Sequence, residues 1–122
     1  MKRLVLTISI ALSMSAGAED GAINFCIDDL SGYASYKAES NKFSKDKISS
    51  SVVVQISKIT GVSVMGWENG KCGTQGDFIV CIDGDTMETY MLSKDGDVYY
   101  TKTTSNPIAR GTKAMVGKLS RC

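Results

Sequence analysis

The chain contains no histidine, and this absence excludes most of the familiar catalytic arrangements. Ser-His-Asp and Cys-His sites both use an imidazole as their general base. A Cys-x-x-Cys pair is also missing, so neither the usual zinc spacing nor the usual redox motif is present. No glycine-rich phosphate loop follows a predicted strand. The sequence therefore predicts a protein that is not an enzyme and that needs no metal or cofactor.

Neither basic nor acidic residues are in clear excess. The chain has 14 basic and 13 acidic residues, whereas nucleic-acid-binding domains usually show a clear basic surplus or stripe. We therefore expect no nucleic-acid partner.

Long apolar runs are absent except at the amino terminus. There, Lys2 and Arg3 precede an apolar run over residues 4–12, and Ala16-Gly17-Ala18 follows. This pattern predicts a secretory signal peptide over residues 1–18 and one small mature domain over residues 19–122. The run is shorter than the roughly 20 residues that span a bilayer. We expect a periplasmic or secreted protein without membrane insertion in its mature form.

Four cysteines lie in the predicted mature domain. An even number in a short exported chain predicts two disulfides, for which three connectivities are possible. We favour Cys72–Cys81, which would close a hairpin-sized loop, and Cys26–Cys122, which would join the two ends of the domain. Each would contribute about 2–5 kcal/mol to stability.

Alternating apolar and polar residues, rich in Val, Ile, Thr and Tyr, predict about six strands. They cover residues 50–59, 62–67, 78–82, 86–92, 98–103 and 113–119. The turn signals between them are too close for intervening helices, so a mostly β, antiparallel up-and-down meander is expected, as a twisted sheet or a small barrel.

The region before residue 50 leaves two alternatives open. Residues 23–27 predict a further strand. Residues 28–37 fit either a short helix, capped by Asp28 or Asp29, or an irregular crossing, so a small α+β fold is possible.

The tripeptide Asp-Gly-Asp occurs twice, at residues 83–85 and 95–97. A calcium loop of the EF-hand type needs more carboxylates at alternate positions and a closing glutamate, which neither segment supplies. Asp-Gly between apolar runs is instead a strong hairpin signal, because both residues tolerate positive φ. We predict two turns and no metal site.

Two-residue turns at Asp83-Gly84 and Asp95-Gly96 would place Val80 opposite Met87 and Met91 opposite Tyr100. The predicted core face then carries Phe78, Val80, Ile82, Met87, Met91, Val98 and Tyr100. The opposite face carries Ile79, Cys81, Thr86, Glu88, Tyr90, Leu92, Tyr99 and Thr101. A turn one residue longer would exchange the two faces of the last strand.

The second of these faces is too apolar for a simple solvent-exposed face. Either the amino-terminal segment and the disulfide partner of Cys81 cover it, or it is an exposed patch that binds a partner. The residues of this candidate patch are Ile79, Tyr90, Leu92 and Tyr99. Arg110, in the segment over residues 105–111, is a further candidate contact that could reach a carboxylate.

These patterns predict an exported, disulfide-stabilised binding protein that acts through protein–protein contact in the cell envelope or outside the cell, as an inhibitor, immunity factor or accessory. The partner is unidentified. One alternative is a small barrel that carries an apolar ligand and is lined by Met65, Met87, Met91 and Met115. Another is a hydrolase that uses two carboxylates from Asp83, Asp85, Glu88, Asp95 and Asp97.

Overall fold

A computed structural model describes residues 23–36, 42–57, 61–68, 70–105 and 110–122. All regular elements within these ranges are strands. They are β1 (Ile23–Tyr36), β2 (Ser44–Lys47), β3 (Val52–Ser57), β4 (Gly61–Val64), β5 (Cys72–Gln75), β6 (Phe78–Asp83), β7 (Thr86–Leu92), β8 (Asp97–Thr104) and β9 (Gly111–Ser120). The predicted signal peptide and the middle of the segment over residues 105–111 lie outside the described residues.

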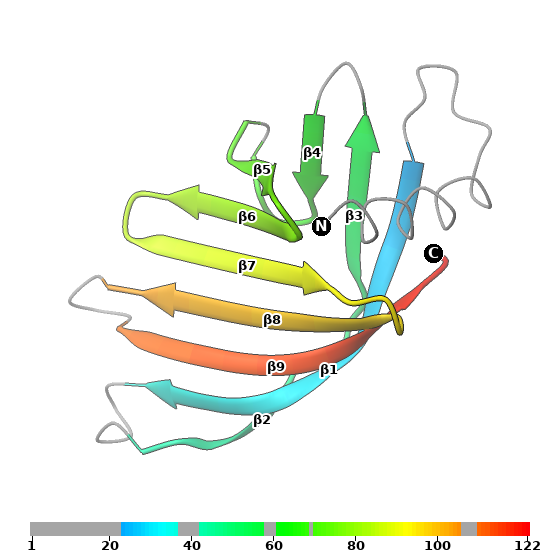
Figure 1. Ribbon diagram of the computed structural model, residues 1–122. Coiled ribbons are helices and arrows are strands. Elements are labelled where there is room, and N and C mark those ends of the chain that lie inside the picture. The colour runs from blue at the N-terminus through cyan, green and yellow to red at the C-terminus, as the bar shows by residue number, and fades with distance from the viewer. Residues whose placement is uncertain (1–22, 37–41, 58–60, 69, 106–109) are drawn as a thin grey trace.

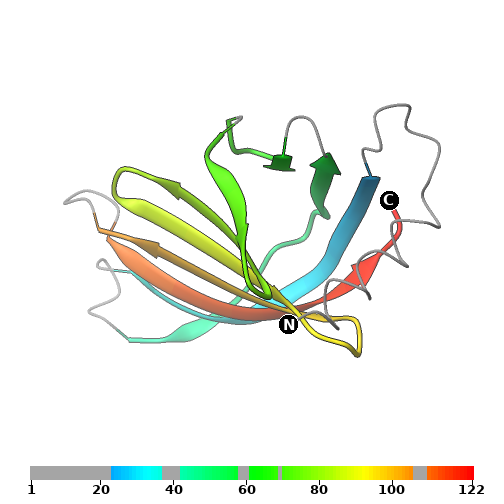
Figure 2. The same ribbon diagram turned by 45° about the horizontal axis from the view of Figure 1, so that its top comes forward.

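Eight of the strands form a closed antiparallel barrel (Figures 1 and 2). The ring runs from β1 through β3 and on to β9, and β9 pairs back with β1. β2 lies outside the ring and pairs with β1. The predicted antiparallel meander is confirmed, and of its two forms, open sheet or barrel, the chain adopts the barrel.

β1 includes residues 28–36, for which the sequence left a short helix and an irregular crossing open, and the helix does not form there. The strand continues to Tyr36 through an irregularity between Asp28 and Ser31, where Asp29 has a φ of 58°. Such a bulge bends a strand. The first half of β1 pairs with β3 and the second half with β2 along one edge, while β9 pairs with both halves along the other. These ladders outweigh the weak local preference for a helix.

Two glycines allow β1 and β9 to approach each other. A Cβ atom on Gly32 would lie 2.2 Å from the carbonyl oxygen of Ala114, and one on Gly117 would lie 2.7 Å from that of Asp28. Both contacts are shorter than real side chains tolerate, so the closing seam of the barrel needs glycine at these positions.

Two short strands were not expected from the sequence. β2 has the sequence Ser-Lys-Asp-Lys, and β5 lies within a glycine-rich stretch that reads as a loop. Neither contains the β-branched alternation by which strands are recognised. Pairing with neighbouring strands, which the local sequence does not reveal, makes them strands.

Both predicted disulfides are confirmed. Cys72 and Cys81 are direct partners on β5 and β6, with Cα atoms 4.0 Å apart. Cys26 of β1 is bonded to Cys122, and their Cα atoms are 5.0 Å apart.

Both Asp-Gly-Asp segments are turns, but their registers differ from those predicted. In the first, Asp83 pairs with Thr86, so the central residues are Gly84 and Asp85 and each strand keeps its faces. In the second, the Ser93 N–H donates to the Asp97 carbonyl over 2.9 Å, and three residues lie between them. This loop is one residue longer than predicted, and Gly96 within it has a φ of 84°. The longer loop exchanges the two faces of β8.

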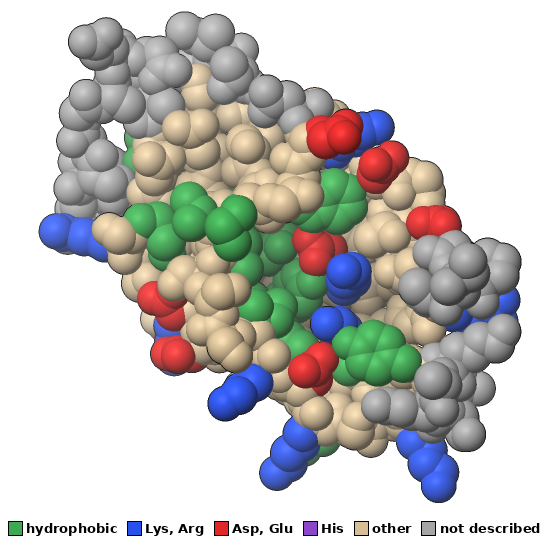
Figure 3. Space-filling model, turned by 180° about the vertical axis from the view of Figure 1, so that it is seen from behind, with side chains coloured by type: hydrophobic (Ala, Val, Ile, Leu, Met, Phe, Trp, Pro, Cys, Tyr) green, Lys and Arg blue, Asp and Glu red, His purple; other side chains and the backbone are tan. Residues whose placement is uncertain are grey.

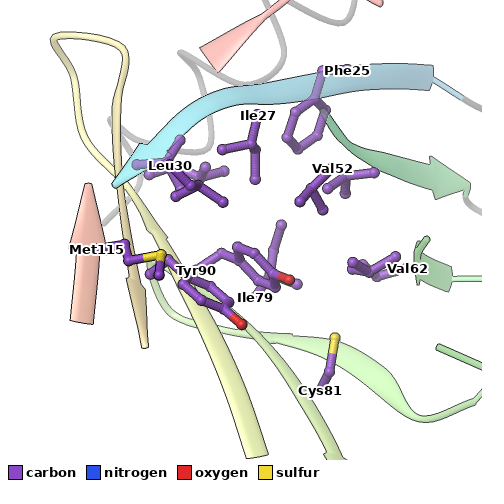
Figure 4. Close-up of a cluster of buried hydrophobic side chains, with 14 residues drawn as sticks. Phe25, Ile27, Leu30, Val52, Val62, Ile79, Cys81, Tyr90 and Met115 are labelled. Carbon is purple, nitrogen blue, oxygen red and sulfur yellow. The ribbon is translucent and has the colours of Figure 1, made fainter. Parts of the chain in front are cut away.

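The core lies on the opposite face of β6 and β7 from the one predicted. Figure 4 shows Phe25, Ile27 and Leu30 of β1 facing Ile79 and Tyr90 across the interior. Phe78, Ile82 and Met87, which were predicted to be core, are exposed. Val98 and Tyr100 are buried as predicted, because the longer second loop turns them toward the side that is in fact the interior. The prediction of the core face was therefore wrong for β6 and β7.

Candidate functional site

The exposed patch that the sequence suggested does not form. Ile79, Tyr90 and Leu92 are 1%, 2% and 2% exposed and point into the barrel, whereas Tyr99 is 43% exposed on the outside. The alternative, that this face is covered by the amino-terminal part of the chain, is confirmed, because side chains of β1 pack against it. Arg110 is exposed and directly precedes β9. Its neighbour Gly111 pairs with Thr104 at the end of β8, whereas Tyr99 lies near the start of β8, so Arg110 and Tyr99 are not close together.

The outside of strands β6 to β9 forms a continuous surface that we call the outer face. Strand alternation and the observed registers place its side chains on one side of the sheet. They are Phe78, Val80, Ile82, Met87, Thr89, Met91, Tyr99, Thr101, Thr103, Thr112, Ala114 and Val116. None of them is charged.

One row of the outer face is apolar across all four strands. Phe78 lies opposite Met91, Met91 opposite Tyr99, and Tyr99 opposite Val116. Contiguous exposed apolar residues of this kind are typical of contact sites on otherwise soluble domains.

The threonines of the outer face bond to one another. The hydroxyls of Thr89 and Thr101 are 2.5 Å apart, and those of Thr103 and Thr112 are 3.4 Å apart. Charge returns only at the end of the face, where Lys118 pairs with Asp97. The outer face is therefore an apolar and hydroxyl surface with a charged boundary.

The free edge of β2 is a poorer place for a partner. Within the described residues β2 pairs only with β1, and its exposed Lys45 and Lys47 flank Asp46. Lysines on an edge strand are a common protection against the addition of another strand.

A second candidate site is the barrel mouth, the end where β6, β8 and β1 finish and β7 and β9 begin. Its inward side chains are polar, and Glu88 is at their centre. The Glu88 carboxylate accepts hydrogen bonds from Trp67 Nε1 at 2.5 Å, from the Tyr90 hydroxyl at 3.0 Å and from the Tyr100 hydroxyl. These three donors hold the carboxylate in one orientation.

The two tyrosines beside Glu88 have strongly perturbed acidity. Burial raises the pKa of Tyr90 and of Tyr100, and the charge of Glu88 and its hydrogen bonds raise both further. Their rings are in contact, with centroids 5.0 Å apart. Both hydroxyls therefore remain protonated donors to Glu88 in the folded protein.

Asp46 is another carboxylate of the barrel mouth, and it pairs with Lys113. The Tyr36 hydroxyl donates to Asp46 Oδ2 at 3.1 Å, and Lys113 Nζ lies 3.5 Å from the same oxygen. The backbone N–H of Lys47 lowers the pKa of Asp46. Burial alone would lower the pKa of Lys113, but Tyr36 and Asp46 outweigh it and the net shift is upward.

Lys102 lies between these two groups. It is directly opposite Glu88 on one side and Lys113 on the other. It lines a hollow of about 520 Å³ that also contains Trp67 and Glu88, and a smaller one of about 170 Å³ that contains Tyr36 and Lys113. Figure 3 shows a hollowed side of the molecule with hydrophobic side chains at its floor and both basic and acidic side chains around it.

Sequence reasoning missed most of the barrel mouth. One signal was available in the sequence, because each of two charged residues shares an alternating run with apolar residues. Glu88 alternates with Tyr90 and Leu92, and Lys102 alternates with Val98 and Tyr100. Inward charge at one end of neighbouring strands indicates an interior that opens to solvent there.

The described residues include no group of three or more acidic or cysteine side chains placed to hold a metal ion. No helix in the described part of the chain has the length and hydrophobicity needed to cross a membrane. No protein-family model matches the chain, and searches of curated proteins and of solved structures also found no match.

Proposed function

We propose that the protein is exported and acts by binding another protein through the outer face. The observation that carries this proposal is the exposure of large apolar side chains on an uncharged sheet surface. The exposed fractions are 41% for Phe78, 54% for Ile82, 40% for Met87, 43% for Tyr99 and 43% for Val116. Two disulfides and the predicted signal peptide support export to an oxidising compartment.

The shape and chemistry of the outer face favour a protein as its partner. Small molecules bind mainly in concave sites, whereas this surface is the convex outside of a barrel. Aromatic residues and methionine, with charge depleted, are the composition of interface centres. A partner surface of the same low charge fits best, because any charge buried against this face would lack a counter-charge.

A carrier of apolar ligands has less support. Of the four methionines expected to line the barrel, only Met115 is buried inside, whereas Met65 and Met87 are exposed and Met91 points outward. The apolar end of the interior is filled by the side chains of the core cluster. Small barrels are commonly filled in this way.

The proposal is tested by photocrosslinking from defined positions. A benzophenone amino acid replaces Tyr99 on the outer face or, as a control, Val53, an exposed outward residue of β3. In cells or envelope extract of the source, we expect one partner to crosslink from position 99 and not from position 53. Val116→Lys should abolish that crosslink, and Val53→Lys should preserve it.

Other outcomes would contradict the proposal. Equal crosslinking from both positions would mean non-specific contact. A crosslink to a second copy of the chain, with a dimer in analytical ultracentrifugation, would replace the partner by self-association. Because the outer face lacks charge, binding should change less than about threefold between 50 and 500 mM salt.

A further inference from the structure

Lys102 and Lys113 are direct neighbours on the inward side of the barrel mouth. Like charges directly opposite each other across two strands destabilise a sheet. Nearby carboxylates that could neutralise the two lysines therefore affect the stability of the barrel mouth. Asp46 lies 3.5 Å from Lys113 and balances that lysine. Lys102 has Glu88 opposite it on β7.

Glu88, however, is held by other donors. Its carboxylate accepts hydrogen bonds from one indole and two phenol groups, and no ion pair joins it to Lys102. Within the part of the chain that the structure describes, no side chain forms a hydrogen bond or ion pair with Lys102. The barrel mouth thus contains a half-buried lysine, Lys102, that has no partner among the described residues and lies next to a second lysine.

The space beside the two lysines suits a small group. They line the hollow of about 170 Å³ together with Tyr36, Thr104 and Gly111. At about 30 Å³ for each water molecule, it has room for a phosphate, a sulfate or a carboxylate with a few attached atoms. Two ammonium groups and the Thr104 hydroxyl are donors of the kind that bind oxyanions.

The neighbouring hollow differs in charge. It is lined by Glu68, Asp83, Asp85 and Glu88, with Lys102 on the wall shared by the two spaces. Its carboxylates repel an anion, which confines an anionic group to the side of Lys113.

We propose that the barrel mouth binds a small oxyanion, or the anionic head group of a larger molecule, between Lys102 and Lys113. Asp46 acts there as an internal competitor, because it occupies Lys113 when no ligand is bound. This site is separate from the outer face and does not depend on the function proposed for that surface.

The test is isothermal titration calorimetry, in which inorganic phosphate is added to the full mature protein at low salt. Heteronuclear NMR of the same titration locates the site. We expect phosphate to shift the Gly111 and Lys113 amide signals. Lys102→Gln should weaken binding by about tenfold or more, as expected for loss of one charge-assisted contact. Lys94→Gln removes an exposed lysine at the opposite end of the barrel and should leave binding unchanged.

Asp46→Asn gives a result in the opposite direction. It removes the competitor of the ligand, so affinity for phosphate should rise several-fold. A merely structural role of Asp46 would lower affinity or leave it unchanged, and either result would overturn the proposed competition.

Further ligands distinguish a free ion from a head group. If phenyl phosphate or octanoate binds more tightly than inorganic phosphate, the ligand is a larger molecule with an anionic end; equal or weaker binding indicates a free oxyanion. Absence of binding at 50 mM of every probe, or equal losses in Lys102→Gln and Lys94→Gln, would refute the site.

Discussion

The inner and outer faces of strands β6 to β9 have almost the same apolar content and opposite environments. Ile79 and Tyr100 are buried, while Ile82 and Tyr99, close to them in the chain, are exposed. Apolar character alone therefore does not decide which face becomes the core. Closure of the ring decides it, because β1 supplies the side chains that cover one face and nothing in the described chain covers the other.

The positions of the charged residues alone would have indicated the wrong face of strands β6 to β9 as the core. The inner face contains Glu88 and Lys102, whereas the outer face is charged only at its end, where Asp97 pairs with Lys118. A charged side chain is normally expected on the wet side of a sheet. Here the inward charges lie at the barrel mouth, where solvent enters and where Glu88 finds three donors, so the cost of partial burial is offset.

Matched isoleucines on β6 give the largest expected contrast between the two faces. Ile79→Ala empties part of the core and should lower the free energy of unfolding by about 2–5 kcal/mol. Ile82→Ala makes the same chemical change on the outer face and should cost less than about 1 kcal/mol. Urea denaturation of both variants measures the difference. Equal losses would mean that the face assignment is wrong.

Alkaline pH should act through the inner tyrosines. Because the folded pKa values of Tyr90 and Tyr100 lie above the unfolded value of about 10, their contribution is intact below pH 10 and falls as the pH rises. The raised pKa of each tyrosine should lower the free energy of unfolding by about 1.4 kcal/mol for every pH unit above pH 10.

The measurement is urea unfolding between pH 8 and pH 11.5, with tyrosinate absorbance recorded in parallel. Replacing Tyr100 with Phe should reduce the slope by about one half. A stability that stays flat above pH 10 would show that these two hydroxyls ionise without unfolding the barrel.

Adjacent tyrosines of β8 give a smaller contrast. Tyr100→Phe leaves Glu88 without one of its donors inside the barrel mouth and should cost about 1–3 kcal/mol. Tyr99→Phe removes a hydroxyl from the outer face and should change stability by less than about 0.5 kcal/mol. Thermal unfolding of the pair measures both. A larger loss from Tyr99→Phe would contradict the inward hydrogen-bond network.

The smallest expected effect on stability belongs to the outer face itself. Val116→Lys should change the free energy of unfolding by less than about 1 kcal/mol, because its side chain already faces solvent. The same change should remove binding of the proposed partner. If Val116→Lys unfolds the protein, residues of this face contribute to the core after all, and the comparison of the two faces fails.

Local signals in the sequence were sufficient for part of the fold. Alternation predicted six of the seven strands after residue 50, and the positions of the cysteines predicted both disulfides. The pairing of β1 with β9 was not predictable, because it joins segments from the two ends of the domain and depends on Gly32 and Gly117, which leave no periodic pattern.

The register was the decisive gap for the candidate sites. Asp-Gly occurs in both turns, but one turn has two central residues and the other loop has three. This single residue determines whether Tyr99 or Tyr100 joins the core. The barrel mouth depends on the same register, since Lys102 meets Glu88 and Lys113 only in the observed pairing.

The disulfide between Cys26 and Cys122 also has a mechanical consequence. It connects positions 96 residues apart whose Cα atoms are only 5.0 Å apart, so almost the whole barrel lies within one covalent loop. Tension applied at these two cysteines is carried by the sulfur–sulfur bond and not by the hydrogen bonds of the strands. The oxidised protein therefore cannot lengthen under such a pull. After reduction the same segment could be drawn out to roughly 320 Å.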